Sequence, residues 1–333
     1  MLRSIATVFA LAAALSAAGE SLNHPTGTQG VLLVDKLGGY VRFLDAGTLR
    51  ERSRLELPKN PHDFALSADH RLAYVPIYGP GIYGRNPEPG HELYVLDLAE
   101  QKVASVIDLA PYRSPHGVQI DANGMLYLTA ELDRKILVVD PKAGRIVDTI
   151  AHEGSGHWVA VLPDGSKAYV ANKNDKPFLS VLDLKARKQI GTVPMPRGTQ
   201  GVTASPDGKR IIAMDLARPE LAVIDTATDT VLERVALAGT TDPAYKAYYS
   251  PDGKWLLTMA GSSISIFDAA NLLAPQRTLK VGASPMGIGF SADGKTALVA
   301  NHGDGTVSAV DIASATVTKT FKAGTGIETL TYY

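Results

Sequence analysis

Residues 200–237 read QGVTASPDGKRIIAMDLARPELAVIDTATDTVLERVAL and contain one complete structural repeat. Residues 200–204 predict an inner strand, and the Ser-Pro-Asp-Gly turn at residues 205–208 follows it, because proline presets φ and glycine supplies positive φ. An Asp-Gly pair between apolar runs is a strong hairpin signal. The three strands that follow span residues 210–214, 221–224 and 231–237. This stretch therefore predicts a four-stranded antiparallel sheet.

The same unit recurs along the chain with an almost constant period. An aspartate closes the third strand of each repeat, and successive aspartates are 52, 43, 43, 42, 43 and 43 residues apart. These aspartates are Asp45, Asp97, Asp140, Asp183, Asp225, Asp268 and Asp311. A period of about 40–45 residues built from strand patterns indicates a β-propeller with one four-stranded blade per repeat.

The two ends of the chain complement each other. Residues 31–34 match a second strand that has no inner strand before it, and residues 327–333 match an inner strand that has no second strand after it. We expect the N- and C-terminal strands to share one blade, because ring closure removes open sheet edges. The sequence thus predicts an all-β, seven-bladed β-propeller as a single domain over residues 19–333.

The first eighteen residues have the plan of a secretory signal peptide. Residues 1–3 are Met-Leu-Arg, an apolar run covers residues 5–15, and small residues end the segment at residues 16–18. The apolar run is too short to span a bilayer comfortably, although an uncleaved anchor is the alternative. We expect cleavage after residue 18, a periplasmic or secreted protein, and no transmembrane segment in the mature chain.

Composition narrows the classes of cofactor and partner. The chain has no cysteine and a formal net charge of −1. Zero cysteine excludes disulfides, thiolate metal sites and covalently attached c-type haem. The balanced charge gives no indication of a nucleic-acid partner. We expect a monomer that binds a small molecule, with a periplasmic protein as a further candidate partner.

The repeat also predicts which residues reach the mouth of the central channel. Five residues before each hairpin turn lies one equivalent position per blade. These positions are His62, His116, His157, Gln200, Tyr245, Met286 and, in the closing blade, Ile327 or Glu328. The second strands end on the same face and contribute Asp35, Lys36, Tyr78, Glu131, Asn172, Lys173, Asp215, Asn301 and His302. A cluster of titratable groups in a concave site favours a functional role.

Three histidines at one phase in successive blades suggest a metal centre. We predict His62, His116 and His157 as ligands of a divalent transition metal such as Zn, Cu or Fe. We predict His116 and Glu131 as catalytic residues, with Glu131 orienting an imidazole or acting as general base on a bound water. The alternative is that these histidines only form structural hydrogen bonds to neighbouring blades.

The remaining polar positions of the mouth are predicted to bind a ligand. They are Tyr78, Lys173, Gln200, Tyr245, Asp215 and His302. The irregular spacing of 52 residues comes from an insertion at residues 75–92, VPIYGPGIYGRNPEPGHE, between a second and a third strand. This insertion is either a lid over the mouth or a tolerated surface loop. Trp158 and Trp255 are interpreted as packing residues.

The chain resembles the YVTN-type β-propeller family in the strings SPDGK, AYVAN and the repeated Val/Ile-Asp strand ends. YVAN at residues 169–172 and LVAN at residues 298–301 are similar to the motif that names the family. Residues 114–146 also resemble a streptogramin lyase repeat, in which His116 and Glu131 occupy the Pro-His-Gly and Thr-Glu positions. Only this repeat matches, so the lyase activity does not carry over.

The resemblance implies an exported propeller that binds a small molecule or a metal, with lactonase-like or lyase-like chemistry as one option. Propeller lactonases hold calcium with carboxylates and amides, and that set is not visible in this sequence. Two alternatives remain open. One is a non-catalytic scaffold for a protein or ligand, and the other is an accessory to a periplasmic redox system with a non-covalent haem or quinone.

Overall fold

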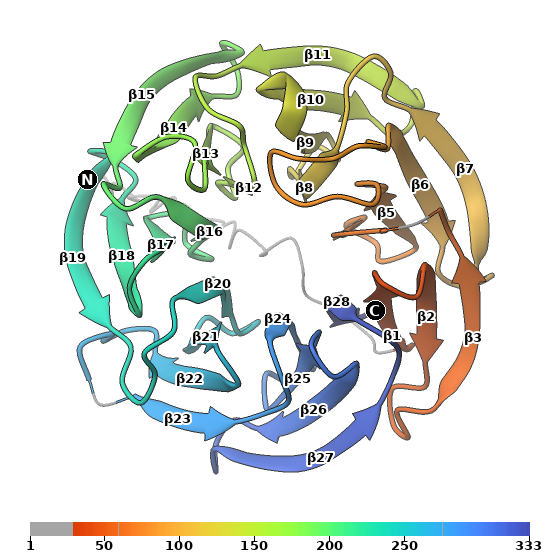
Figure 1. Cartoon of the computed structure of the whole chain (residues 1–333), viewed down its shortest axis with the longest axis vertical. Helices are drawn as coiled ribbons and strands as arrows, with labels where there is room; N and C mark the ends of the chain where they lie inside the picture. The colour runs from red at the N-terminus through yellow and green to blue at the C-terminus, as the bar shows by residue number, and fades with distance from the viewer. Residues whose placement is uncertain (1–28, 59, 275) are drawn as a thin grey trace, which may run out of the picture.

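The structure is a computed structural model that describes residues 29–58, 60–274 and 276–333. It confirms the all-β propeller: seven four-stranded antiparallel sheets stand around a common axis (Figure 1). The predicted signal peptide, residues 1–18, lies outside the described residues. Within the described ranges, no helix is long and apolar enough to cross a membrane.

The blades follow one another in chain order, and each extends from an inner strand at the channel to an outer strand at the rim. The closing blade contains β28 (Ile327–Tyr332), β1 (Val31–Asp35), β2 (Tyr40–Leu44) and β3 (Glu51–Glu56). The second contains β4 (Ala65–Leu66), β5 (Leu72–Pro76), β6 (Glu92–Asp97) and β7 (Lys102–Asp108). The third contains β8 (Pro115–Ile120), β9 (Leu126–Ala130), β10 (Lys135–Asp140) and β11 (Arg145–Ala151), with a 3-10 turn at Glu131–Asp133.

The other four blades repeat this arrangement. The fourth contains β12 (Trp158–Val161), β13 (Lys167–Ala171), β14 (Phe178–Asp183) and β15 (Lys188–Pro194). The fifth contains β16 (Thr199–Ala204), β17 (Arg210–Asp215), β18 (Glu220–Asp225) and β19 (Thr230–Ala236). The sixth contains β20 (Ala244–Tyr249), β21 (Trp255–Ala260), β22 (Ser263–Asp268) and β23 (Arg277–Lys280). The seventh contains β24 (Pro285–Phe290), β25 (Thr296–Asn301), β26 (Thr306–Asp311) and β27 (Thr316–Lys322).

The two ends of the chain close the ring as predicted. Strand β1 pairs antiparallel with β28, so that Leu33 lies opposite Leu330. The buried Asp35 carboxylate accepts hydrogen bonds from the backbone N–H groups of Thr325 (3.0 Å) and Gly326 (2.9 Å). Arg42 Nη2 also donates to Asp35, at 2.8 Å. The closing blade is therefore joined by strand pairing and by a buried ion pair.

The repeated aspartates cap turns between the third and outer strands. Asp225 Oδ1, for example, accepts hydrogen bonds from the N–H groups of Ala227 (3.0 Å) and Thr228 (2.8 Å). Such side-chain caps replace a backbone partner in the turn. The aspartate that marks each repeat in the sequence therefore has a structural role, and it lies away from the channel.

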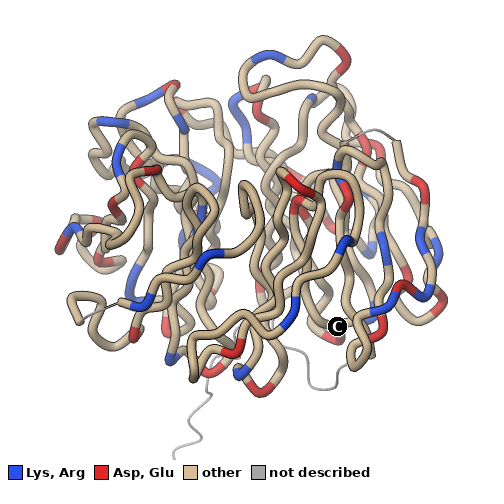
Figure 2. The backbone as a smooth tube through the Cα atoms, turned by 60° about the horizontal axis from the view of Figure 1, so that its bottom comes forward, with Lys and Arg blue, Asp and Glu red and all other residues tan. Residues whose placement is uncertain are grey.

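The inner strands pack closely against one another near the axis. A Cβ added at Gly201 of β16 would lie 2.3 Å from the backbone oxygen of Tyr245 in β20. Glycine at this position therefore permits the close approach of neighbouring blades. On the outer strands and loops, Figure 2 shows basic and acidic residues interspersed, in keeping with the formal net charge of −1.

Candidate functional site at the channel mouth

All seven blades contribute side chains to one cavity of about 160 Å³ at an end of the channel. A cavity of about 150 Å³ is large enough for one benzene molecule. The lining comprises Lys36, His62, Tyr78, Gly81, Ile82, Tyr83, His116, His157, Trp158, Lys173, Gln200, Tyr245, Lys246, Met286 and Glu328. We call this space the mouth cavity. Its size suits a small ligand.

The three predicted metal ligands lie together as a stack of imidazole rings. The ring centroids of His62 and His116 are 3.9 Å apart, and those of His116 and His157 are 3.8 Å apart. The planes are tilted by 46° and 35°. Within the described part of the chain, no group of three or more His, Cys, Asp or Glu side chains is placed to hold a metal ion. The metal centre therefore stays a prediction.

Burial keeps the stacked imidazoles neutral. It lowers the pKa of His62, His116 and His157 well below the usual value for histidine. Positive charge nearby lowers these values further, because a protonated ring would be repelled by the next ring or by a lysine. Since all three rings are neutral at neutral pH, each has one N–H donor and one nitrogen acceptor.

Two fully buried nitrogen atoms in this stack have no hydrogen-bond partner among the described residues. They are the buried Nδ1 atoms of His62 and His116. Lys36 Nζ donates to the other nitrogen of His62, Nε2, at 2.8 Å. Glu328 Oε1 lies farther from the same Nε2, at 3.3 Å. Because the closer Lys36 ammonium can only donate, we assign the proton of the neutral His62 ring to Nδ1, which makes this atom a buried N–H donor without an acceptor. Buried donors of this kind are rare and call for a ligand or a water.

The insertion between β5 and β6 covers one side of the stack. Tyr83 Oη lies 2.7 Å from the backbone oxygen of Ser155 and 2.8 Å from that of Asn172, so its single O–H is shared between two acceptors of the fourth blade. The Tyr83 ring centroid lies 5.0 Å from that of His157. Figure 1 shows this connection extending toward the ring centre in front of β8. The loop is therefore a wall of the cavity.

Glu131 links the same loop to the third blade by hydrogen bonds. Its carboxylate, which is fully buried, accepts hydrogen bonds from Tyr78 Oη (2.8 Å) and from the N–H of Gly84 (2.7 Å). Its second oxygen lies 3.4 Å from His157 Nδ1. The two predicted catalytic residues therefore do not contact each other through this carboxylate: Glu131 contacts His157, and His116 lies in the middle of the stack. This geometry favours a positioning role for Glu131.

On the opposite side of the stack, a lysine and a glutamate fix His62. Lys36 Nζ lies 3.6 Å from Glu328 Oε1, and His302 Nδ1 lies 3.1 Å from the other carboxylate oxygen. Burial opposes ionisation of Glu328, but Lys36 and His302 outweigh it and lower the pKa of the carboxyl. Glu328 is therefore a carboxylate at neutral pH, and His302 reaches the site through it.

The mouth cavity has more cationic than anionic groups. Three lysines line it, Lys36, Lys173 and Lys246, against the carboxylates of Glu328 in the lining and of Glu131 behind it. Burial lowers the pKa of Lys173, whose Nζ lies 5.0 Å from the centroid of the Tyr83 ring. The local balance favours an anionic ligand over a cationic one.

The other predicted ligand-binding residues are divided between the cavity and the surrounding structure. Tyr78, Lys173, Gln200 and Tyr245 line the mouth cavity. Asp215 lies elsewhere, because Arg197 Nε donates to it at 3.1 Å and because it caps the turn after β17 by accepting from the N–H of Ala217 at 2.9 Å. Arg197 gave no signal in the sequence, since it precedes the inner strand in an irregular loop.

Trp158 and Lys246 are the lining residues that the sequence pattern missed. Each follows a predicted mouth position directly, and simple strand alternation would point it away from that position. The pairing of β20 with β21 shifts register between Ala244 and Ala247, so a bulge lies at Lys246. Trp158 was expected to be a packing residue, but it lines the cavity, and Lys246 Nζ lies 3.8 Å from its ring centroid.

This fold and cavity define the class of protein, a seven-bladed β-propeller. The chain is similar to the solved structure of hydrazine synthase from Kuenenia stuttgartiensis, with a TM-score of 0.69 and 18% identity over 81% of this chain and 88% of that chain. It is also similar to the β-propeller domain of Swd1 from Myceliophteria thermophila, with a TM-score of 0.64 and 13% identity over 79% of this chain and 86% of that chain.

No family model matches the chain, and no curated protein sequence matches it. Likeness at these identities establishes the fold alone, because one fold hosts many functions. The narrower resemblance to YVTN-type propellers stays a prediction.

Proposed function

We propose that this propeller binds a small anionic molecule, a carboxylate or a related oxyanion, in the mouth cavity. The observation that carries the proposal is the buried Nδ1 of His62, which has no hydrogen-bond partner among the described residues. The Lys36 ammonium at the other ring nitrogen assigns the ring proton to this Nδ1. An anionic oxygen would satisfy this donor, and the ammonium groups of Lys36 and Lys173 would supply charge-assisted contacts.

The cavity also limits the size and the shape of the ligand. A volume of about 160 Å³ is below the range of about 300–1,000 Å³ found for drug-sized ligands. Ile82 and Tyr83 of the β5–β6 connection would lie over the bound molecule. A flat carboxylate could pack against the imidazole stack and the Trp158 ring, with its oxygens toward the lysines.

A transition metal is the second candidate ligand. The support is the donor chemistry, since three neutral imidazoles suit Zn, Cu or Fe and His116 Nδ1 has no partner among the described side chains and backbone groups. Two facts weigh against it: Lys36 already occupies His62 Nε2, and positive groups surround the stack. Metal binding would require Lys36 to withdraw from His62.

Calorimetric titration separates these candidates. Acetate, lactate, succinate, phosphate and Zn²⁺ would each be added to the protein at pH 7.5. We expect at least one anion to bind, and His116→Gln and Lys173→Met to weaken that binding about tenfold, as expected for a lost charge-assisted contact. The matched control is Lys102→Met, which removes an exposed lysine on β7 and should change nothing.

Two other outcomes are informative. Stoichiometric Zn²⁺ binding that disappears in His62→Gln would favour the metal centre and overturn the anion proposal. Binding of neither anion nor metal would leave the channel mouth as part of a scaffold and would overturn both.

A periplasmic location belongs to the same proposal. The charged start, the apolar run and the small residues of positions 1–18 support export, as does the absence of cysteine. N-terminal sequencing of protein from a periplasmic extract should give residue 19 as the first residue. A mature chain that still begins with Met1 in the cytoplasmic fraction would contradict this location.

A further inference from the structure

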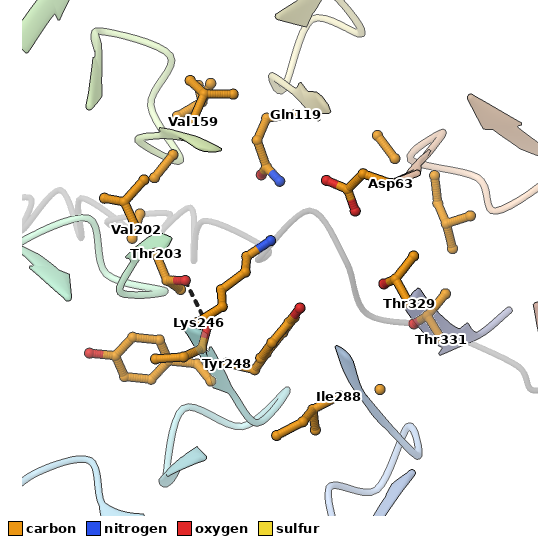
Figure 3. A pocket seen from close by; sticks show the side chains of 18 of the residues that line it. Asp63, Gln119, Val159, Val202, Thr203, Lys246, Tyr248, Ile288, Thr329 and Thr331 are labelled. Carbon is orange, nitrogen blue, oxygen red and sulfur yellow. Dashed lines mark hydrogen bonds between the residues drawn. The ribbon is translucent and has the colours of Figure 1, made fainter. Parts of the chain in front are cut away.

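The channel contains a second cavity, which Lys246 shares with the first. It has a volume of about 190 Å³ and is shown in Figure 3. Pro163, Ser205 and Pro206 line it, and these residues belong to the hairpin turns at the ends of the inner strands opposite the histidines. We call it the inner cavity. None of the three stacked histidines lines it.

Two buried charges of opposite sign face the inner cavity without pairing with each other. Lys246 is 8% exposed and Asp63 is 5% exposed. Within the described ranges no salt bridge joins them, so the Lys246 nitrogen and the Asp63 oxygens are more than 4.0 Å apart. Figure 3 shows the Lys246 side chain extending into the cavity, with Asp63 and Gln119 across from it.

Each charge is held by groups that do not neutralise it. The Lys246 ammonium lies against aromatic faces, 3.8 Å from the Trp158 ring centroid and 5.1 Å from that of Tyr248. The Asp63 carboxylate faces the backbone N–H of Val118 at 3.5 Å. Burial raises the pKa of Asp63 to about 6, and Lys246 limits the rise, so the group is largely ionised at neutral pH. A buried charge without a counter-charge is unfavourable.

The rest of the lining is partly hydroxylic and partly apolar. Thr329 and Thr331 of β28 and Tyr248 of β20 contribute hydroxyl groups (Figure 3). Burial raises the pKa of Tyr248 well above its usual value, so this hydroxyl stays neutral. Val202 and Ile288 add apolar surface. A ligand would therefore find hydrogen-bonding groups beside a small apolar patch.

We propose that the inner cavity binds a small α-amino acid as its zwitterion, with the ligand carboxylate on Lys246 and the ligand ammonium near Asp63. A simple carboxylate would be repelled by Asp63, and a simple amine would be repelled by Lys246. A neutral molecule would leave the two protein charges to compensate each other only across the cavity, without direct pairing. The volume of about 190 Å³ restricts the ligand to a small side chain. This site is independent of the anion proposed for the mouth cavity.

The test compares three matched probes by calorimetric titration at pH 7.5, with the Lys173→Met variant, because loss of this mouth lysine weakens anion binding at the mouth and leaves the lining of the inner cavity intact. L-Alanine carries both charges, lactate carries only the carboxylate, and ethanolamine carries only the ammonium. We expect L-alanine to bind at least about tenfold more tightly than either single-charge probe, because only it satisfies both Lys246 and Asp63. Equal affinities of this variant for L-alanine and lactate, or no binding of L-alanine, would overturn the proposal.

Variants then assign the binding to this cavity. Asp63→Asn should lower the affinity for L-alanine about tenfold and bring it close to that for lactate, since the ammonium loses its partner. Asp108→Asn, which removes an exposed carboxylate at the end of β7, is the matched control and should leave L-alanine binding unchanged. Circular dichroism would verify that both variants are folded. An Asp63→Asn variant that keeps its full affinity for L-alanine would contradict this inference.

Discussion

Lowering the pH from 7.5 to 5.5 should destabilise this protein by about 4 kcal/mol, because buried imidazoles stay neutral in the fold and gain protons when the chain unfolds. In the unfolded chain, histidine has a pKa of about 6.5. In the folded protein, burial and neighbouring positive charge lower the pKa of His62, His116 and His157 well below that. The unfolded state therefore binds more protons below about pH 6.5, and stability falls as the pH falls.

The magnitude follows from proton linkage. Over this interval each neutral imidazole contributes a loss of about 1.4 kcal/mol, so the stack contributes about 4 kcal/mol. His152, whose pKa burial lowers to about 4, adds a loss of about 1 kcal/mol. Asp63 acts in the opposite direction by about 1 kcal/mol, because its pKa of about 6 lets the folded protein gain a proton first. The net loss remains about 4 kcal/mol, a large share of an ordinary stability of about 5–15 kcal/mol.

Urea unfolding at pH 7.5, 6.5 and 5.5, followed by tryptophan fluorescence, measures this dependence. His116→Gln should reduce the difference between the two extreme pH values by about 1.4 kcal/mol, since one buried imidazole is removed. The control is His91→Gln, because the His91 side chain is half exposed on the insertion. A wild-type difference of less than about 1 kcal/mol would refute the reasoning, as would a His116→Gln variant that keeps the whole dependence.

Three further predictions concern the frame around the site. Gly201→Ala should lower the free energy of unfolding by about 2 kcal/mol, because the added Cβ would clash with the backbone of β20. The control Gly191→Ala should not lower it, because the space around its added Cβ is open, and urea titration of both variants measures the difference. Asp35→Asn should destabilise the ring by about 3 kcal/mol, because Arg42 keeps a buried charge without its main partner, and the urea midpoint reports it. Tyr83→Phe should speed hydrogen exchange in residues 79–85 about fivefold, since about 1 kcal/mol of anchoring is lost; unchanged exchange would contradict an anchored wall.

The fold could be predicted because its signals are local and repeated. Each Asp-Gly turn and each capping aspartate acts within one blade, so the period is visible without any long-range information. The complementary ends, residues 31–34 and 327–333, predicted the shared blade in the same way. The position of Glu328 at the mouth was one of two alternatives, and the register of β28 decides between them.

The site was harder to predict, because its details depend on contacts between blades. The Lys246 side chain points into the channel because of a bulge in β20, and no residue pattern in the sequence predicted this bulge. Tyr83 forms a wall only because it meets backbone oxygens of the fourth blade. Asp215 occupies the same position in its repeat as other residues that end second strands, but an ion pair with Arg197, from an irregular loop, holds it away from the mouth cavity. In each case the deciding partner lies far away in the sequence or in an irregular segment.

The most direct measurement of the proposed mouth site is an NMR titration of histidine side chains in protein labelled with ¹⁵N-histidine. We expect the imidazoles of His62, His116 and His157 to stay neutral from pH 7.5 to about 5.5, and those of His62 and His116 to shift when the anion is added. Three imidazoles that titrate near the usual pH of about 6.5 and do not respond to any anion would contradict a built anion site.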